Sequence, residues 1–323
     1  MVQRRPDRTD GVTGWVPVPH RCPDSGGTGG SARVRLSSME PEPPLARRLW
    51  QAVEPLHAVV YFDPGPAAEA RRIGLKGWWM GYFAGRFAPL GPIGPGPATA
   101  MAFGFSPRMV ARSLPDAWRL ATPEAVQAGR AQAAASSLRA LLAGDEAPVV
   151  ELAGLLAEAV AGCRFDGRPL AAGWATVAVP DDPFVRLWLL ASVLREHRGD
   201  GHVLAAVSLG LSGLDASVSN VATGAVTREL LQSNRGWTDD EWEGSRRQLQ
   251  GRGLLDTHGS LTARGIGLRR RLEEATDRLA TGPVERLGTP GVERALALAT
   301  PLARRVIDDG PVPVPNPIGA PRP

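Results

Sequence analysis

Lysine is nearly absent from this chain of 323 residues, and cysteine is scarce. Lys76 is the one lysine among 37 basic residues, so almost every cationic side chain is an arginine. The bias toward arginine reflects a GC-rich coding sequence before any physical requirement. The two cysteines, Cys22 and Cys163, are too few for a zinc cluster or a disulfide framework, and their scarcity suits a reducing compartment.

Long apolar runs are missing as well. The longest, Leu187–Leu194, is much too short to span a bilayer. No basic-then-apolar signal peptide begins the chain. We therefore expect a cytoplasmic protein that has no membrane partner.

The chain also lacks a strongly basic surface, although its formal net charge is +4. Residues 1–38 hold six arginines against three aspartates, which accounts for +3 of that charge. The remainder is close to neutral, whereas a strongly basic nucleic-acid binder concentrates positive charge on its domain.

Both ends of the chain lack helical or strand periodicity. Residues 1–38 are rich in Gly, Ser, Pro, Arg and Asp, which predicts a disordered extension. Met39 follows directly, and we expect it to be the true start codon. Residues 310–323 alternate proline with small residues and are predicted to be a disordered tail.

Between these ends the patterns favour a mainly α protein. A stripe of apolar residues predicts a helix over 45–60, and alanine-rich segments predict helices over 123–142, 148–161 and 183–197. The segment 75–87 carries three glycines at a spacing of four, which indicates close approach of another backbone or a ligand. We expect a helical domain over 40–200 and a further helical segment over 283–309.

The most informative stretch is 236–265. Thr238 and Glu241 have the spacing of a capping box, and the helix they begin is predicted to stop at Gly253. Two short apolar pieces then predict a hairpin, and Thr262 caps another long helix. Helix, two-stranded wing, helix is the order of a winged helix-turn-helix, which we place over 203–282.

The wing sequence, L-x-x-R-G-L-L-D…L-T-x-x-G from Leu249 to Gly265, resembles that of MarR-type regulators. The longer chain, from Leu45 to about Gly288, resembles the actinobacterial SalK-like helix-turn-helix family. The segments that carry this resemblance are FAPLGP (Phe87–Pro92), SLPDAW (Ser113–Trp118), LREHRGDGH (Leu194–His202) and RGWTDDEW (Arg235–Trp242). The resemblance implies an α-helical architecture more than a particular chemistry.

The densest polar segment is 195–202. Arg195, His197, Asp200 and His202 follow one apolar helix and precede another, so we place them on the connection between the two halves. They are candidate ligand-binding residues, because binding sites favour such junctions. The alternative is structural: cations suit a helix C-terminus that ends at Gly199, and Asp200 caps the next helix. The spacing matches no established metal-ligand pattern, and we expect neither a metal nor a cofactor.

Three further residues are candidates for a ligand pocket. His57 lies on an otherwise apolar helix, where a hydrogen-bonded core histidine is the more common outcome. Trp79 and Arg86 belong to the glycine-rich helix, whose aromatic side chains either line an apolar pocket with Arg86 as its polar anchor or pack as ordinary core.

DNA binding is disfavoured by charge. In a winged helix-turn-helix the recognition helix places its first turns in the major groove. Here those turns carry four carboxylates, which repel phosphate: Asp239, Asp240, Glu241 and Glu243. The candidate DNA contacts are Arg246, Arg247 and Arg264.

Two hypotheses follow. The leading one, from the resemblance, is a winged-helix protein that binds or senses a small molecule and regulates transcription as a homodimer of the MarR-like kind. The alternative is an enzyme or ligand-binding accessory protein of actinobacterial secondary metabolism, in which the winged helix is a scaffold that does not bind DNA. Fold alone does not decide between them.

Overall fold

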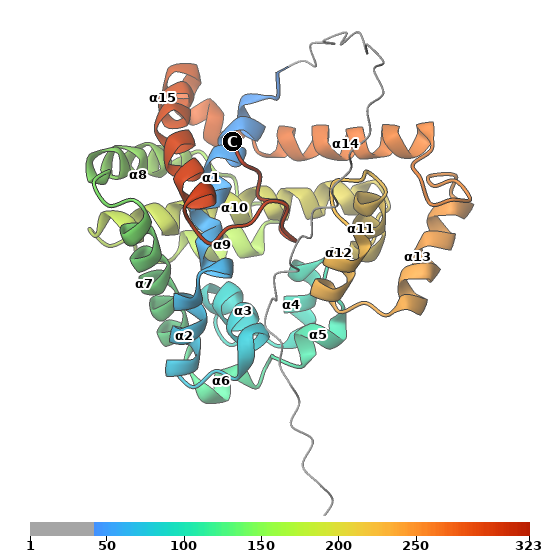
Figure 1. The fold of residues 1–323 in the computed structure, drawn as a ribbon, viewed down its shortest axis with the longest axis horizontal. Coiled ribbons are helices and arrows are strands. Elements are labelled where there is room, and N and C mark those ends of the chain that lie inside the picture. Colours follow the sequence, from blue (N-terminus) through green and yellow to red (C-terminus); the bar gives the residue numbers. More distant parts are fainter. Residues whose placement is uncertain (1–41) are drawn as a thin grey trace, which may run out of the picture. The chain divides into compact units, whose positions relative to one another are not determined.

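Helices provide nearly all of the regular structure in residues 42–323, which are the residues that the computed structural model describes (Figure 1). The predictions for residues 1–38 and for Met39 lie outside this range. The helices are α1 (Leu45–Phe62), α2 (Pro64–Arg72), α3 (Gly77–Phe87), η1 (Ala88–Leu90), α4 (Pro95–Ala102), α5 (Pro107–Ala111), α6 (Ala117–Leu120), α7 (Pro123–Leu141), α8 (Glu146–Ala161), α9 (Pro169–Ala175), α10 (Pro183–Ser208), α11 (Gly213–Val221), α12 (Arg228–Arg235), α13 (Asp239–Gly251), α14 (Ala263–Leu279) and α15 (Thr281–Asp308).

The prediction of a mainly α fold is confirmed. The short two-stranded wing is not confirmed: within residues 42–323 the β structure is one isolated antiparallel bridge, between Leu255 and Leu261. Two backbone hydrogen bonds flank this bridge, from the Asp256 amide to the Ser260 carbonyl at 2.9 Å and from the Thr262 amide to the Leu254 carbonyl at 3.1 Å. The predicted two-stranded wing is therefore reduced to a short hairpin loop between α13 and α14.

Two clusters of buried apolar side chains hold the helices together. The large cluster draws on α1, α3, α7, α8, the first half of α10 and α15, and contains fully buried Leu56, Phe83 and Trp188. The small cluster draws on the end of α10 and on α11–α14, with Leu249 and Leu272 fully buried. Helix α1 packs against α7, α10 and α15, which places it inside the large cluster.

Helix α10 differs from the prediction. We expected a helix to end at Gly199 and another to begin at residue 203, but α10 continues without a break through Pro183–Ser208. A helix-interior glycine costs only about 1 kcal/mol relative to alanine. Packing offsets this cost, because a Cβ on Gly201 would lie 3.2 Å from Arg168 Nη1, a buried side chain that needs this space.

Helices α12 and α13 form a helix-turn-helix whose local signals match the sequence. The Thr238 side chain accepts from the Glu241 amide and the Glu241 carboxylate accepts from the Thr238 amide, so the predicted capping box is present. Gly236 supplies the left-handed conformation of the turn (φ 72°). Gly253, also left-handed, follows α13 as predicted.

The turn between α12 and α13 is held by the segment that leads into α5. The Ser106 amide donates to the Arg235 carbonyl at 2.8 Å, and Trp237 Nε1 donates to the Gly104 carbonyl at 2.8 Å. Arg108 Nη2 donates to the Gly236 carbonyl at 3.0 Å. We call residues 103–108 the docking segment, because it fixes the helix-turn-helix on the helical scaffold.

The C-terminal residues differ from the predicted disordered tail. Helix α15 is interrupted at Gly288, and the segment after α15 folds around Asn316, whose side-chain amide donates to the Pro313 and Ala320 carbonyls at 2.8 and 2.7 Å. Val312 and Ala320 are buried in the large cluster. Proline-rich composition hid this packing, since it removes helical periodicity without preventing burial.

No single helix among residues 42–323 has the length and hydropathy to cross a membrane. Helices α10 and α11 pass that test only when they are joined, and they are bent by 95° relative to each other.

The contact between the scaffold and α11 makes a testable prediction. A Cβ on Gly213 would lie 1.7 Å from the Phe103 carbonyl oxygen, which is backbone and cannot rotate away. We expect Gly213→Ala to lower the free energy of unfolding by about 1–3 kcal/mol, the usual range for overpacking. Gly244→Ala is the control, because that helical glycine faces open space, and alanine there should stabilise by up to about 1 kcal/mol. Urea denaturation of both variants measures the difference, and an unchanged Gly213→Ala midpoint would refute this close contact.

Candidate functional site

Two adjoining cavities lie between the scaffold and α11–α14. Their volumes are about 330 and 260 Å³, and five residues line both, so we treat them together as the junction cavity: Arg86, Arg195, His202, Glu273 and Ile318. The combined space falls within the range of small-molecule sites, roughly 300–1,000 Å³. Its walls come from α1, α3, α10, the docking segment, α11, α12, α14 and residues 317–319.

The periodicity of α10 sorts the polar residues of 195–202 by face. Arg195, Arg198 and His202 are spaced i, i+3, i+7 and line the junction cavity. The aromatic-rich helix α3 contributes Tyr82 and Arg86 to the same cavity. The polar segment and the aromatic helix therefore share a concave site.

His197 and Asp200 lie on other faces of α10 and perform structural tasks. Asp200 accepts from the Leu170 and Ala171 amides, both at 3.0 Å, so it caps α9 rather than a following helix. Burial raises the pKa of Asp200 to about 6. The His197 ring lies 3.0 Å from Arg168 Nη1, and burial, together with this cation, lowers its pKa to about 4. Neither residue lines the junction cavity.

A buried ion network forms one wall. Arg86 donates to both carboxylate oxygens of Glu196, at 3.1 and 2.9 Å. Arg195 bridges Glu54 and Glu196 at 3.0 and 2.9 Å. Burial alone would raise the pKa of Glu196, but Arg86 and Arg195 hold it below its ordinary value. The network links α1, α3 and α10 through charge-assisted hydrogen bonds, which are among the strong ones.

The opposite wall belongs to α14 and α12. His202 Nδ1 lies 3.0 Å from Thr276 Oγ1, and Arg198 donates to Asp277 at 2.8 Å. Arg269 donates to Asn220 at 3.2 Å, and Arg235 donates to the Pro317 carbonyl at 2.9 Å. Helices α10, α11, α12 and α14 thus meet around one arginine-rich space.

His57 is a satisfied core histidine, 1% exposed. Its Nδ1 lies 2.8 Å from Ser192 Oγ, its Nε2 lies 3.0 Å from the Tyr61 hydroxyl, and its ring stacks on Trp188 at 5.5 Å. Burial, followed by the field of nearby arginines, lowers the pKa of His57 well below its ordinary value. It does not line the junction cavity.

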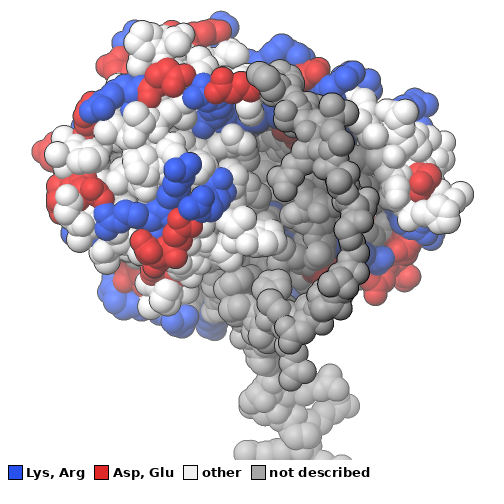
Figure 2. All heavy atoms as spheres, turned by 45° about the horizontal axis from the view of Figure 1, so that its top comes forward, with Lys and Arg blue, Asp and Glu red and all other residues white. Residues whose placement is uncertain are grey.

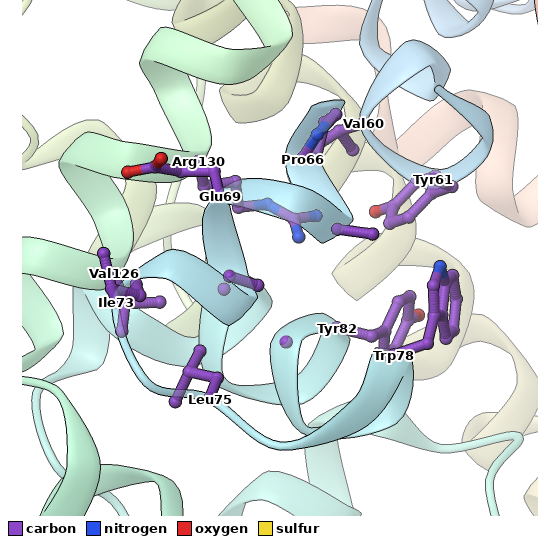
Figure 3. Close-up of a pocket in the computed structure, with 14 residues that line it drawn as sticks. Val60, Tyr61, Pro66, Glu69, Ile73, Leu75, Trp78, Tyr82, Val126 and Arg130 are labelled. Atoms are coloured by element: carbon purple, nitrogen blue, oxygen red, sulfur yellow. The ribbon is translucent and has the colours of Figure 1, made fainter. Parts of the chain in front are cut away.

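Trp79 packs with Phe83 and Phe105 in an aromatic group and does not line the junction cavity. The glycines of α3 leave space for neighbouring side chains. A Cβ on Gly85, for example, would lie 2.7 Å from Arg130 Nη1. Arg130, Tyr61, Tyr82 and Trp78 line a separate pocket of about 30 Å³. Figure 3 shows this pocket. Arg130 is 9% exposed, and its Nε and Nη2 atoms have no hydrogen-bond partner among residues 42–323.

Sequence reasoning missed Arg198, Arg235 and Arg269, which line the junction cavity. Arg198 had a usable signal, since it shares the helical face of Arg195 and His202 once the helix is known to continue. Arg235 and Arg269 reach the cavity from α12 and α14, and no local pattern predicts that tertiary approach. Within residues 42–323 no group of three or more His, Cys, Asp or Glu side chains is placed to hold a metal ion.

The candidate DNA contacts do not form a basic face. Arg246 is bonded to Glu243 at 2.6 Å, whereas Arg247 and Arg264 are exposed. The carboxylates at the start of α13 engage other nearby arginines: Arg228 bonds Asp239 and Glu243, and Arg108 bonds Glu241. Residues 213–279 hold ten arginines and ten acidic residues. Figure 2 shows the two signs interspersed on the visible face.

The sequence was compared with models of known protein families. A model of a helix-turn-helix family matches residues 46–313, well over half of the chain. The chain therefore belongs to this helix-turn-helix family. No curated protein and no solved structure matches it.

The environment of His57 predicts a pH effect on stability. In the unfolded chain the imidazole titrates near 6.5, so below that pH the unfolded state binds a proton that the native state does not. Stability contributed by the neutral ring is present above about pH 6.5 and is lost on acidification, by about 1.4 kcal/mol per pH unit. We expect His57→Gln to reduce the slope of unfolding free energy against pH by that amount between pH 6 and 5.

Ser192→Ala is the matched control for this measurement. It removes the 2.8 Å contact to His57 but leaves the titrating ring, so it should lower stability at every pH without flattening the slope. Urea unfolding of the three proteins at several pH values provides the comparison. Equal slopes for wild type and His57→Gln would show that His57 is protonated in the native state.

Proposed function

We propose that this helix-turn-helix protein binds a small molecule in the junction cavity. The observation that carries the proposal is the cavity itself, which has the volume of a ligand site and lies where the scaffold meets α11–α14. The shared placement of Arg86, Arg195 and His202 favours this function, because convergent polar groups fix a ligand's orientation.

The walls of the cavity connect a ligand to the helix-turn-helix. Phe103, Gly104 and Phe105 line the cavity and belong to the docking segment, whose backbone holds the turn between α12 and α13. Arg235, the last residue of α12, also lines it. A ligand that contacts these residues acts on the same joint that fixes α13, which is the geometry a sensor needs. The hairpin loop after α13 supports a winged, MarR-like variant of the motif.

Filling the cavity tests the proposal. Val203 lines the cavity, whereas Val207, one turn later on α10, is 59% exposed. A library of acidic, basic and neutral fragments should contain compounds that raise the melting temperature of the wild-type protein. Because tryptophan occupies the space, we expect Val203→Trp to abolish these shifts, while the matched Val207→Trp variant retains them.

Two results would contradict the proposal. One is a library without a stabilising compound for the wild type. The other is a set of stabilising compounds that act equally on Val203→Trp, which would place their binding elsewhere on the protein. Circular dichroism of both tryptophan variants checks that each is folded.

Transcriptional regulation is the second candidate function. Family membership supports it, and so do the guanidinium groups of Arg247 and Arg264, which are exposed and have no carboxylate within ion-pair distance among residues 42–323. The carboxylates at the start of α13 weigh against insertion of that end into a groove. DNA binding therefore requires that Arg247 and Arg264 contact phosphates while the acidic first turn of α13 stays out of the groove.

Duplex DNA binding at two salt concentrations tests the regulator function. If it holds, Arg247→Gln and Arg264→Gln should each weaken binding and reduce the salt slope by about 1, since each removes one phosphate contact. Arg119→Gln, an exposed arginine on α6, is the control and should leave both quantities unchanged. Absence of binding even at low salt would eliminate this candidate and leave the helix-turn-helix as a scaffold.

A further inference from the structure

The geometry points to an organic oxyanion as the ligand of the junction cavity: a carboxylate or phosphate group held by arginines and attached to an apolar body. This inference rests on the proposed function, because it names the chemical class of the molecule that the cavity takes. Three features of the wall favour such a ligand: its positive charge, the unpaired buried donor of Arg198 and its apolar residues.

Positive charge dominates the cavity wall. Five arginines line it, against the carboxylates of Glu54 and Glu273: Arg86, Arg195, Arg198, Arg235 and Arg269. The carboxylates behind the wall add no free acceptor. Glu196 is shared by Arg86 and Arg195, and Asp277 is shared by Arg198 and Arg47. Arginine is always protonated in proteins, so this excess cannot be relieved by proton loss.

Among residues 42–323, Arg198 has a buried donor without a partner, and Arg235 has no carboxylate partner. Arg198 has a side chain that is 9% exposed, and its Nη1 atom is buried without a hydrogen-bond partner. Arg235 bonds the Pro317 carbonyl and lies over the Phe105 ring at 4.2 Å, and no carboxylate of residues 42–323 lies within ion-pair distance of it. A buried donor left without an acceptor costs free energy, and more when it is charged. An anionic ligand supplies the acceptors that the protein does not.

The ion network beside the cavity has no spare negative charge to offer these arginines. Arg86, Arg130 and Arg195 surround the two carboxylates of Glu54 and Glu196, so three buried guanidinium groups face two anions. Arg130 contacts ring faces instead, with its guanidinium carbon 5.3 Å from the centroid of Tyr61 and 5.9 Å from that of Trp188. An additional negative charge in the adjoining cavity is therefore favoured by the field of the whole network.

Part of the cavity wall is apolar. Near Arg235 the cavity is lined by Met101, Phe103, Phe105, Val226 and Leu231. A simple inorganic anion would leave this surface in contact with water. A molecule with a hydrocarbon or aromatic body covers it and gains about 25 cal/mol per Å² of apolar area buried. Guanidinium groups and apolar side chains in the same lining, with Arg235 directly over the Phe105 ring, select an amphipathic anion.

Four probes that share one aromatic body separate charge from shape: naphthalene-2-carboxylate, 2-naphthyl phosphate, the neutral naphthalene-2-carboxamide and the cationic 2-naphthylmethylamine. Isothermal calorimetry with the full chain measures each. We expect the carboxylate or the phosphate to bind about tenfold or more tightly than the amide, because charge-assisted hydrogen bonds distinguish them. The stronger of the two anions identifies the source of the oxyanion, and the cation should bind most weakly.

Substitutions of the wall arginines locate the binding. We expect Arg235→Gln and Arg269→Gln each to reduce anion affinity about tenfold while leaving amide affinity unchanged, and Arg235→Lys to retain part of the preference. Arg270→Gln is the control, because its side chain is 76% exposed and lies outside the cavity lining. Two arginine positions on different helices keep the test valid if one variant fails to fold.

The outcomes separate this inference from the proposed function. One outcome would overturn the oxyanion inference and leave the proposed function standing. In it, the carboxylate, the phosphate and the amide bind with equal affinity, Arg235→Gln leaves that affinity unchanged, and Val203→Trp abolishes binding. The cavity would then be a ligand site that selects for apolar groups. Tighter binding of the cation would overturn it in favour of Glu54 and Glu273 as the recognition groups. Anion binding that Val203→Trp leaves intact, or absence of binding by all four probes, would count against both.

Discussion

The structure depends on a buried ion network that joins three helices of the scaffold. Glu54 on α1, Arg86 on α3, and Arg195 with Glu196 on α10 satisfy one another in the interior, where an unpaired charge is costly. Each residue of the network therefore fixes the position of the others. Three of them, Glu54, Arg86 and Arg195, also line the junction cavity, so this wall has a defined shape before any ligand arrives. Preorganisation of this kind reduces the cost of binding.

The cavity lies at the joint that positions the helix-turn-helix. The docking segment holds the turn between α12 and α13 through three hydrogen bonds, each accepted by a backbone carbonyl, and its Phe103 and Phe105 line the cavity. A ligand shifts a conformational equilibrium only to the extent that it binds the two states differently. Phe103, Phe105 and Arg235 are the residues through which such a difference can arise, since they contact both the cavity and the joint.

The sequence predicted what local chemistry encodes. The Thr238–Glu241 capping box, Gly253 after α13 and the helix start at Thr262 are decided by neighbouring residues, and the structure has them. The sequence could not predict that α10 continues past Gly199 and Gly201. Glycine locally favours the end of a helix, but here the buried Arg168 side chain from another part of the chain occupies the space beside Gly201. The polar segment contributes Arg195 and His202 to the cavity, as predicted, and Arg86 reaches it from the aromatic helix. His197 and Asp200 do not line it, because consecutive polar residues on a helix point in several directions.

Helix α10 is shared by both hydrophobic clusters. Phe184–Val193 belong to the large cluster and Ala205 and Ala206 to the small one, along a helix of 26 residues that extends about 39 Å. A cut between the two halves would therefore pass through a continuous helix and expose an apolar face on each side. Recombination cannot exchange the helix-turn-helix of this protein as a module, as it can for domains on flexible linkers.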